Sequence, residues 1–241
     1  MHRVIIHPTA ELTARSAGMR LLLALVERQA LEVPIHVALT GGSMGIGMLE
    51  ALRNEPLLEA VDWSEVHLWW GDERFAEDSE RNASQAREAL LDSLPIPAEN
   101  IHEVARPGDV ETAAVAAEVY ADEVAGVRFA IVVLGMGPDG HVASLFPGRE
   151  EIEISGRGAV PVADSPKPPP ERVSLSREKL EDTDELWFVA AGADKAEAVA
   201  ASLAGGEGSD ALPVARVRGD STLWLLDAAA AGIDATDAPG A

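Results

Sequence analysis

The chain has 241 residues, of which 47% are hydrophobic and 25% charged, and this globular composition excludes a mostly disordered, collagenous or coiled-coil protein. Its 41 acidic side chains outnumber the 19 Lys and Arg side chains, and the net charge of −22 opposes binding to nucleic acid. The sequence has no cysteine for a disulfide or a thiolate zinc site, and no apolar run approaches the roughly 18–20 residues that span a bilayer. The N-terminus also lacks the pattern of a signal peptide. We therefore expect a cytoplasmic protein without membrane or nucleic-acid partners.

Short runs rich in β-branched residues alternate with helical patterns, which predicts βαβ units around a parallel sheet. We expect strands at residues 3–7, 35–39, 66–70, 101–104, 129–134, 186–191 and 221–226. We expect helices at residues 9–29, 83–91, 111–123 and 194–203, and another from Ser43 to about Arg53. The pattern predicts a single doubly wound, Rossmann-like α/β domain over residues 1–234, with a mostly parallel sheet and helices on both faces. Residues 235–241 are expected to form a disordered tail.

Two local signals concern the ends of these elements. Asn82, followed by Gln85 three residues later, predicts a capping pair at the start of the helix 83–91. Pro161, Pro166 and the prolines at 168–170 predict a loop, because proline interrupts helices.

Ligands of open parallel sheets bind beyond the carboxyl ends of the strands, so the loops at those ends are the candidate sites. The first is Thr40-Gly41-Gly42-Ser43, where two glycines allow close approach to a ligand and the following helix offers free N–H groups to a phosphate. The alternative is a tight turn in which Ser43 caps the helix. The loop matches neither of the two common phosphate-binding glycine motifs.

The second loop, Gly71-Asp72-Glu73-Arg74, ends a strand with two carboxylates and a guanidinium. Such a set can hold a polyhydroxylated anion, with carboxylates on hydroxyls and Arg74 on the anionic group. The alternative is a solvated turn of ion pairs.

The third loop runs from Gly135 to His141 and matches the G-x-G-x-x-G spacing of dinucleotide-binding loops. Asp139 would oppose a pyrophosphate there, and the Phe-Pro-Gly sequence that ends at Gly148 stops any helix within two turns, so we expect no dinucleotide. What remains is an acid–histidine pair, Asp139 and His141, suited to general-base chemistry. The alternative is that Asp139 only stabilises the turn and that His141 has no role in catalysis.

The remaining candidates are the cations Lys167, Arg172 and Lys195, each of which has a surface position as its alternative. Lys195 is expected in the first turn of its helix, where the helix dipole disfavours a cation unless an anion binds beside it. The six histidines are dispersed without metal-ligand spacing, and His67 is expected to pack in the core, so the sequence predicts no metal site.

Several of these segments occur together in a known family. The series is Leu39–Ser43, Trp70–Arg74, Asp78–Asn82, Leu134–Gly148 and Arg172–Ser176. This series resembles the 6-phosphogluconolactonases, whose superfamily also contains glucosamine-6-phosphate deaminase. The resemblance extends from the first strand to beyond Lys195, and the run from Asp139 to Gly148 is its most specific part.

The resemblance implies a cofactor-free hydrolase that converts 6-phospho-D-glucono-1,5-lactone and water to 6-phosphogluconate in the oxidative pentose phosphate pathway. In this hypothesis His141 is the general base, Asp139 orients it, and backbone N–H groups with Arg74 face the oxyanion. The substrate is bound by the residues Thr40, Gly41, Gly42, Ser43, Asp72, Arg74, Arg172 and Lys195. Within this set, we expect the phosphate to be bound by Gly41, Gly42, Ser43, Arg172 and Lys195. Arg74 can bind either the phosphate or the oxyanion, and Asp72 accepts hydrogen bonds from the hydroxyls of the substrate. Arg81 and Lys167 receive no role from the resemblance.

Two alternatives remain open: a deaminase or isomerase of an amino-sugar phosphate, and a non-catalytic sugar-phosphate sensor. Deaminases carry a carboxylate in the stretch after the histidine, whereas this chain has Ser144-Leu-Phe-Pro147. A sensor would need a further binding domain that the sequence does not show. No stripe that would mediate oligomerisation is visible, so we expect a monomer.

Overall fold

The computed structural model describes residues 2–205 and 211–233. Its centre is a sheet of six parallel strands in the order β3-β2-β5-β8-β9-β1. These strands are β1 (His2–His7), β2 (Ile35–Leu39), β3 (Val66–Trp70), β5 (Phe129–Leu134), β8 (Thr183–Ala190) and β9 (Ser221–Asp227). The helices are α1 (Ala10–Gln29), α2 (Gly42–Glu50), α3 (Asn82–Ala89), α4 (Ala113–Glu123), α5 (Arg177–Glu181), α6 (Ala196–Ala204) and α7 (Pro213–Arg216).

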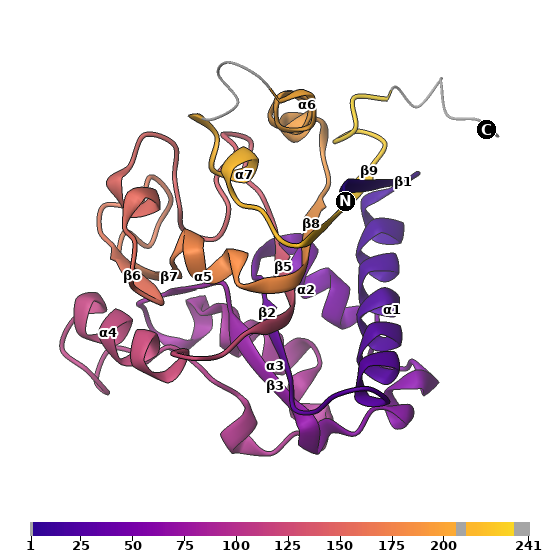
Figure 1. Cartoon of the computed structure of the whole chain (residues 1–241), viewed down its shortest axis with the longest axis horizontal. Coiled ribbons are helices and arrows are strands. Elements are labelled where there is room, and N and C mark those ends of the chain that lie inside the picture. The colour runs from indigo at the N-terminus through magenta and orange to yellow at the C-terminus, as the bar shows by residue number, and fades with distance from the viewer. Residues whose placement is uncertain (1, 206–210, 234–241) are drawn as a thin grey trace.

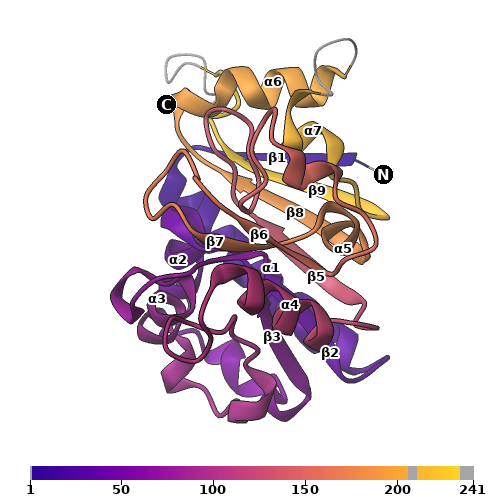
Figure 2. The same ribbon diagram turned by 90° about the vertical axis from the view of Figure 1, so that its left-hand side faces the viewer.

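Helices cover both faces of this sheet, as expected for a doubly wound fold. In the fully buried strand β5, Ile131 and Val133 join the core on the side of α1, α2 and α3, whereas Val132 and Leu134 join the opposite core. That opposite core also contains side chains of α4, α6 and α7. Figures 1 and 2 show α1 on one side of the sheet and α4 on the other. The expected parallel α/β architecture is therefore confirmed.

A second, three-stranded antiparallel sheet packs beside α4 and was absent from the sequence-based prediction. Its order is β4 (Asp72–Arg74), β7 (Arg172–Leu175) and β6 (Ala159–Val162). Pro161 therefore lies in a strand, not in the predicted loop. Because β6 is an edge strand, a proline without an N–H group is tolerated there. The other prolines, Pro166 and 168–170, do lie in the loop between β6 and β7, here named the proline loop (residues 163–171).

The predicted strand 101–104 is also wrong. Ile101 forms one isolated bridge with Leu68 at the sheet edge, where the His102 N–H donates to the Leu68 oxygen at 2.8 Å, and residues 103 and 104 form no further pairing with the sheet. The backbone oxygen of Val104 instead accepts a hydrogen bond from the buried guanidinium of Arg81.

The start of α3 differs from its predicted capping pair. Arg81 occupies the N-cap position and Asn82 is already helical. The buried carboxylate of Glu73 takes over the capping role, accepting from the backbone N–H groups of Asn82 at 2.7 Å and Ala83 at 2.9 Å. Glu73 thereby ties α3 to strand β4.

Three histidines that are dispersed in the sequence meet at the amino ends of β2 and β3. His36 and His67 are direct neighbours in the parallel register, and His67 Nδ1 lies 2.9 Å from His102 Nε2. His67 is half-buried there, not packed in the core. Across residues 2–205 and 211–233, no group of three or more His, Asp or Glu side chains has a geometry that could hold a metal ion.

The expected tail, 235–241, lies outside the described residues. Among the helices that the structure describes, none combines the length and apolar character needed to cross a membrane.

Candidate active site

A cavity of about 300 Å³ lies beyond the carboxyl ends of β2, β3, β5 and β8, a volume suited to a small ligand. It brings together every site residue predicted from the sequence except Asp139, which does not line the cavity but is hydrogen-bonded to His141. The predicted residues that line it are Thr40, Gly41, Gly42, Ser43, Asp72, Arg74, His141, Arg172 and Lys195. Lys167, Asn82 and Met136 also line the cavity.

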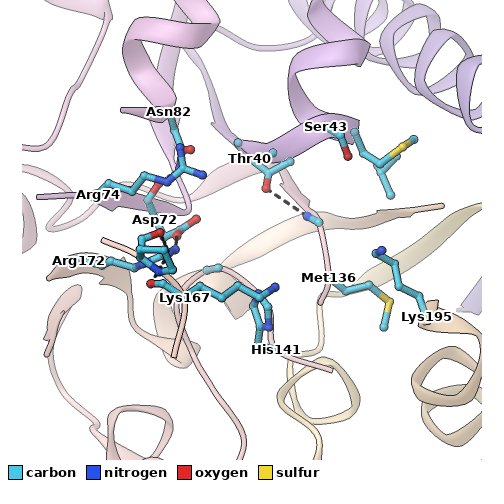
Figure 3. A pocket seen from close by; sticks show the side chains of 17 residues that line it. Thr40, Ser43, Asp72, Arg74, Asn82, Met136, His141, Lys167, Arg172 and Lys195 are labelled. Carbon is cyan, nitrogen blue, oxygen red and sulfur yellow. Dashed lines mark hydrogen bonds and ion pairs between the residues drawn. The ribbon is translucent and has the colours of Figure 1, made fainter. Parts of the chain in front are cut away.

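Figure 3 shows how the labelled side chains are distributed around the cavity. Ser43 and Lys195 lie on one side, and Arg74, Asp72 and Arg172 lie on the other. His141 and the end of the Lys167 side chain lie between these two groups.

The loop after β2 presents backbone to the cavity, not a side-chain cap. Gly41 is the N-cap residue of α2 and no side chain caps this helix, so the alternative in which Ser43 is the cap is wrong. A Cβ atom on Gly41 would lie 2.0 Å from Oδ1 of Asn82, so only glycine allows this close approach. The first N–H groups of α2 are therefore left for a ligand.

His141 and Asp139 form a hydrogen-bonded pair at the rim of the loop after β5. Nδ1 of His141 lies 2.5 Å from Oδ1 of Asp139, and the imidazole packs against the ring of Phe146. Burial lowers the pKa of His141, and although Asp139 opposes this, the net shift is downward. A neutral ring that donates Nδ1–H to Asp139 keeps a lone pair on Nε2, as a general base requires.

Burial raises the pKa of Asp139, but the hydrogen bond and the charge of His141 outweigh burial, so the pKa is lowered overall. The carboxylate therefore stays ionised and holds the ring. Close packing around the pair requires Gly137, because a Cβ atom there would lie 2.0 Å from Cε1 of His141. No helix begins directly after Gly140, so this loop lacks the helix N-terminus that a dinucleotide-binding loop presents to a pyrophosphate.

Strand β4 separates the three charges of the second loop. Because side chains alternate along a strand, Asp72 and Arg74 face the cavity whereas Glu73 is buried behind it. Nη1 of Arg74 donates to the backbone oxygen of Glu80 at 2.6 Å. A solvated ion-pair turn is therefore the wrong description of this segment.

Glu73 and Arg81 form a buried pair that supports the site without lining it. Arg81 Nε lies 3.6 Å from Glu73 Oε2, and both side chains are buried. Burial raises the pKa of Glu73, while Arg81 and three backbone N–H groups act against that rise. Sequence reasoning noted Glu73 but missed this function, because its helix partners lie nine and ten residues further along the chain.

A buried serine that sequence reasoning missed holds Asp72. Ser144 Oγ donates to Asp72 Oδ2 at 2.6 Å, and Nη1 of Arg172 lies 3.4 Å from the same Oγ. The other donors of Arg172 bind backbone oxygens of the proline loop, at Lys167, Pro168 and Pro169. Arg172 thus fixes the proline loop over the cavity. The only sequence signal for Ser144 was its position three residues after His141.

Lys195 lies at the N-cap of α6, because this helix begins at Ala196 and not at residue 194 as predicted. Its Nζ lies 3.0 Å from Asp194 Oδ2, and this carboxylate offsets the unfavourable helix dipole. The expected electrostatic penalty is therefore already relieved within the chain.

Comparisons with known proteins agree with this geometry. The sequence profile described as glucosamine-6-phosphate isomerases/6-phosphogluconolactonase matches residues 8–224. The 6-phosphogluconolactonase of Streptomyces coelicolor is 44% identical, with 95% of this chain and 93% of that protein covered. The 6-phosphogluconolactonase of Mycobacterium tuberculosis is 39% identical, with 94% and 96% covered. The crystal structure of 6-phosphogluconolactonase from Leishmania guyanensis is 27% identical and superposes with a TM-score of 0.81, covering 95% of this chain and 97% of that chain.

The profile match includes every residue that lines the cavity. The chain belongs to the glucosamine-6-phosphate isomerase/6-phosphogluconolactonase family.

Proposed function

We propose that this protein is a cytoplasmic, monomeric hydrolase that converts 6-phospho-D-glucono-1,5-lactone to 6-phospho-D-gluconate, the second step of the oxidative pentose phosphate pathway. Relatives that are 39% and 44% identical over most of the chain carry the name of this activity. The observation that carries the proposal is the His141–Asp139 pair, whose ring faces a cavity with a glycine loop and several cations.

The proposed reaction needs only water as co-substrate. Nε2 of His141 takes a proton from water as the oxygen attacks the lactone carbonyl, and the resulting imidazolium returns the proton to the departing ring oxygen. Asp139 keeps the ring in the required tautomer and stabilises the imidazolium. No redox or group-carrying cofactor takes part in these steps.

The substrate contacts follow the chemistry of the cavity walls. The N–H groups at Gly41, Gly42 and Ser43, together with Lys195 on the same side of the cavity, bind the phosphate, whereas Arg172 lies on the opposite side and holds the proline loop. Thr40 shapes this end of the cavity, because its Oγ1 accepts from the backbone N–H of Gly135 at 3.2 Å (Figure 3).

The opposite wall binds the sugar end of the lactone. Asp72, held by Ser144, accepts hydrogen bonds from sugar hydroxyls, and Arg74 serves the oxyanion or the phosphate. A deaminase would use a carboxylate in residues 142–148 to open a sugar ring, and that segment contains none.

The test generates the lactone in situ from glucose 6-phosphate and follows its disappearance with and without the protein, after subtraction of spontaneous hydrolysis. Faster loss of the lactone supports the proposal. Release of ammonia from glucosamine 6-phosphate would replace it by a deaminase, and lactone binding without turnover would replace it by a sensor. The molecular mass of the protein in solution, measured by size-exclusion chromatography, tests the proposal that it is a monomer.

A further inference from the structure

We propose that Lys167 is a further catalytic residue, whose ammonium group contacts the lactone carbonyl oxygen as negative charge develops on it. The inference rests on the lactonase activity proposed above. Among the lysines and arginines, Lys167 is the one with no role in that proposal that nevertheless lines the cavity.

The position of the side chain supports this assignment. Lys167 belongs to the proline loop between β6 and β7, and it lines the same cavity as His141. Figure 3 shows its side chain extending across the cavity towards the His141 ring, between the group with Lys195 and the group with Arg172. The carbonyl carbon must lie next to His141 when water attacks, so a cation at this place is close to the reacting oxygen.

The other cations of the cavity are already engaged by the protein. Lys195 pairs with Asp194, Arg74 donates to the backbone oxygen of Glu80, and Arg172 donates to the proline loop and Ser144. Among the residues that the structure describes, the ammonium group of Lys167 has no hydrogen bond or ion pair. Its donors are therefore available for substrate without breaking a contact.

The backbone of Lys167 is nevertheless fixed in place. Its oxygen accepts from Nη2 of the buried Arg172 at 3.0 Å, and its N–H donates to Ser165 Oγ at 3.3 Å. The N–H of Ser165 in turn donates to the oxygen of Pro170 at 2.9 Å, which closes the loop on itself. An anchored backbone with an unengaged side chain lets the ammonium group reach the substrate at a limited entropic cost.

The charges around His141 agree with this role. Asp139 and Asp72 act to raise the pKa of His141, whereas burial and the charge of Lys167 lower it. Lys167 thus favours the neutral imidazole that can accept a proton. The same positive charge stabilises the oxyanion, so both effects assist attack by water.

The reaction passes through a tetrahedral oxyanion. The water oxygen forms a bond to the carbonyl carbon, its proton passes to Nε2 of His141, and the carbonyl π electrons move to the oxygen that Lys167 contacts. Collapse of this oxyanion reforms the C=O bond and breaks the bond to the ring oxygen, which receives the proton from His141. Lys167 keeps its own proton throughout, as an electrostatic donor.

The experiment compares Lys167→Met and Lys167→Arg with the parent chain in the lactone assay. We expect Lys167→Met to lower kcat by roughly 10²–10³, as removal of an oxyanion donor does in other enzymes, with little change in KM. Lys167→Arg should recover part of kcat. The acid limb of kcat/KM should move to higher pH in Lys167→Met, because loss of the positive charge raises the pKa of His141.

Two variants separate this role from its alternatives. Lys195→Met should raise KM and weaken inhibition by inorganic phosphate, as expected for a phosphate ligand. Arg157→Met removes a positive charge from an exposed position outside the cavity and should leave kcat, KM and the pH profile unchanged.

An unchanged kcat in Lys167→Met would overturn the inference, as would a profile like that of Lys195→Met with weakened phosphate inhibition. Either result would leave the proposed function standing if the parent chain is active. A parent chain that does not accelerate lactone hydrolysis overturns the proposed function and this inference together.

Discussion

A Cβ atom on Gly137 would lie 2.0 Å from Cε1 and 2.1 Å from Nδ1 of His141, so the absence of a side chain at position 137 allows the imidazole its place. Backbone bonds reinforce this packing: the Gly137 N–H donates to the oxygen of His141 at 3.0 Å. The loop after β5 is thus folded around its histidine.

Gly137→Ala should therefore displace His141 and lower kcat by about 10²-fold, since misplacement of a catalytic group by about 1 Å has this effect. Steady-state kinetics in the lactone assay measure the loss. Gly47→Ala is the matched control, because its Cβ would meet only Ala14 at an ordinary 3.6 Å. Equal activity of the two variants would contradict the proposed place of His141 in the chemistry.

His141→Asn should lower kcat by roughly 10²–10⁴, because asparagine cannot take a proton from water. The ring is not part of the main cores, so the midpoint of thermal unfolding should change little. Kinetics and a thermal melt on the same sample check both statements. Near-normal turnover would remove His141 from the mechanism.

The pH dependence of kcat/KM should show an acid limb below pH 6.5, because the pKa of His141 is lowered from that value and the protonated ring is inactive. Asp139→Asn removes the charge that raises this pKa, so the limb should move to still lower pH while the plateau falls. Rates across a series of buffers test this shift. A limb that moves upward would mean that another group titrates.

Glu73→Gln should destabilise the fold by about 3 kcal/mol, because it leaves the buried Arg81 with only the more distant carboxylate of Glu103, at 3.9 Å, and replaces an acceptor of three N–H groups. The midpoint of urea unfolding measures this change. Glu77→Gln, an exposed neighbour, should leave the midpoint in place. A small effect at Glu73 would show that the pair contributes little.

The parallel sheet could be predicted from the sequence because its strands are short and strongly apolar. Strands 35–39 and 129–134 have the predicted bounds, since buried parallel strands carry continuous hydrophobic runs. The same rule places the loops after those strands at one edge of the sheet, which is why the cavity residues could be named in advance.

The small antiparallel sheet could not be predicted in this way. Strand β4 has three residues, all charged, and the short apolar run of β6 is interrupted by Pro161, which argues against a strand. The bond between Ser144 and Asp72 was equally invisible, because it joins residues 72 positions apart through tertiary packing. A short strand of charged and polar residues is determined by the strands and side chains that it contacts, and a single sequence does not reveal these contacts.

The antiparallel pairing of β4 and β7 sets Arg74 directly opposite Arg172, and Asp72 opposite Ser174. This ladder holds the inner wall of the cavity independently of the segment that joins β6 to β7. The parts of residues 163–171 that do not contact Arg172 can therefore vary in length and sequence without altering the register beneath them. Substrate range in this scaffold is thus open to change by grafting this segment, provided that the graft keeps Lys167 and its backbone contact with Arg172.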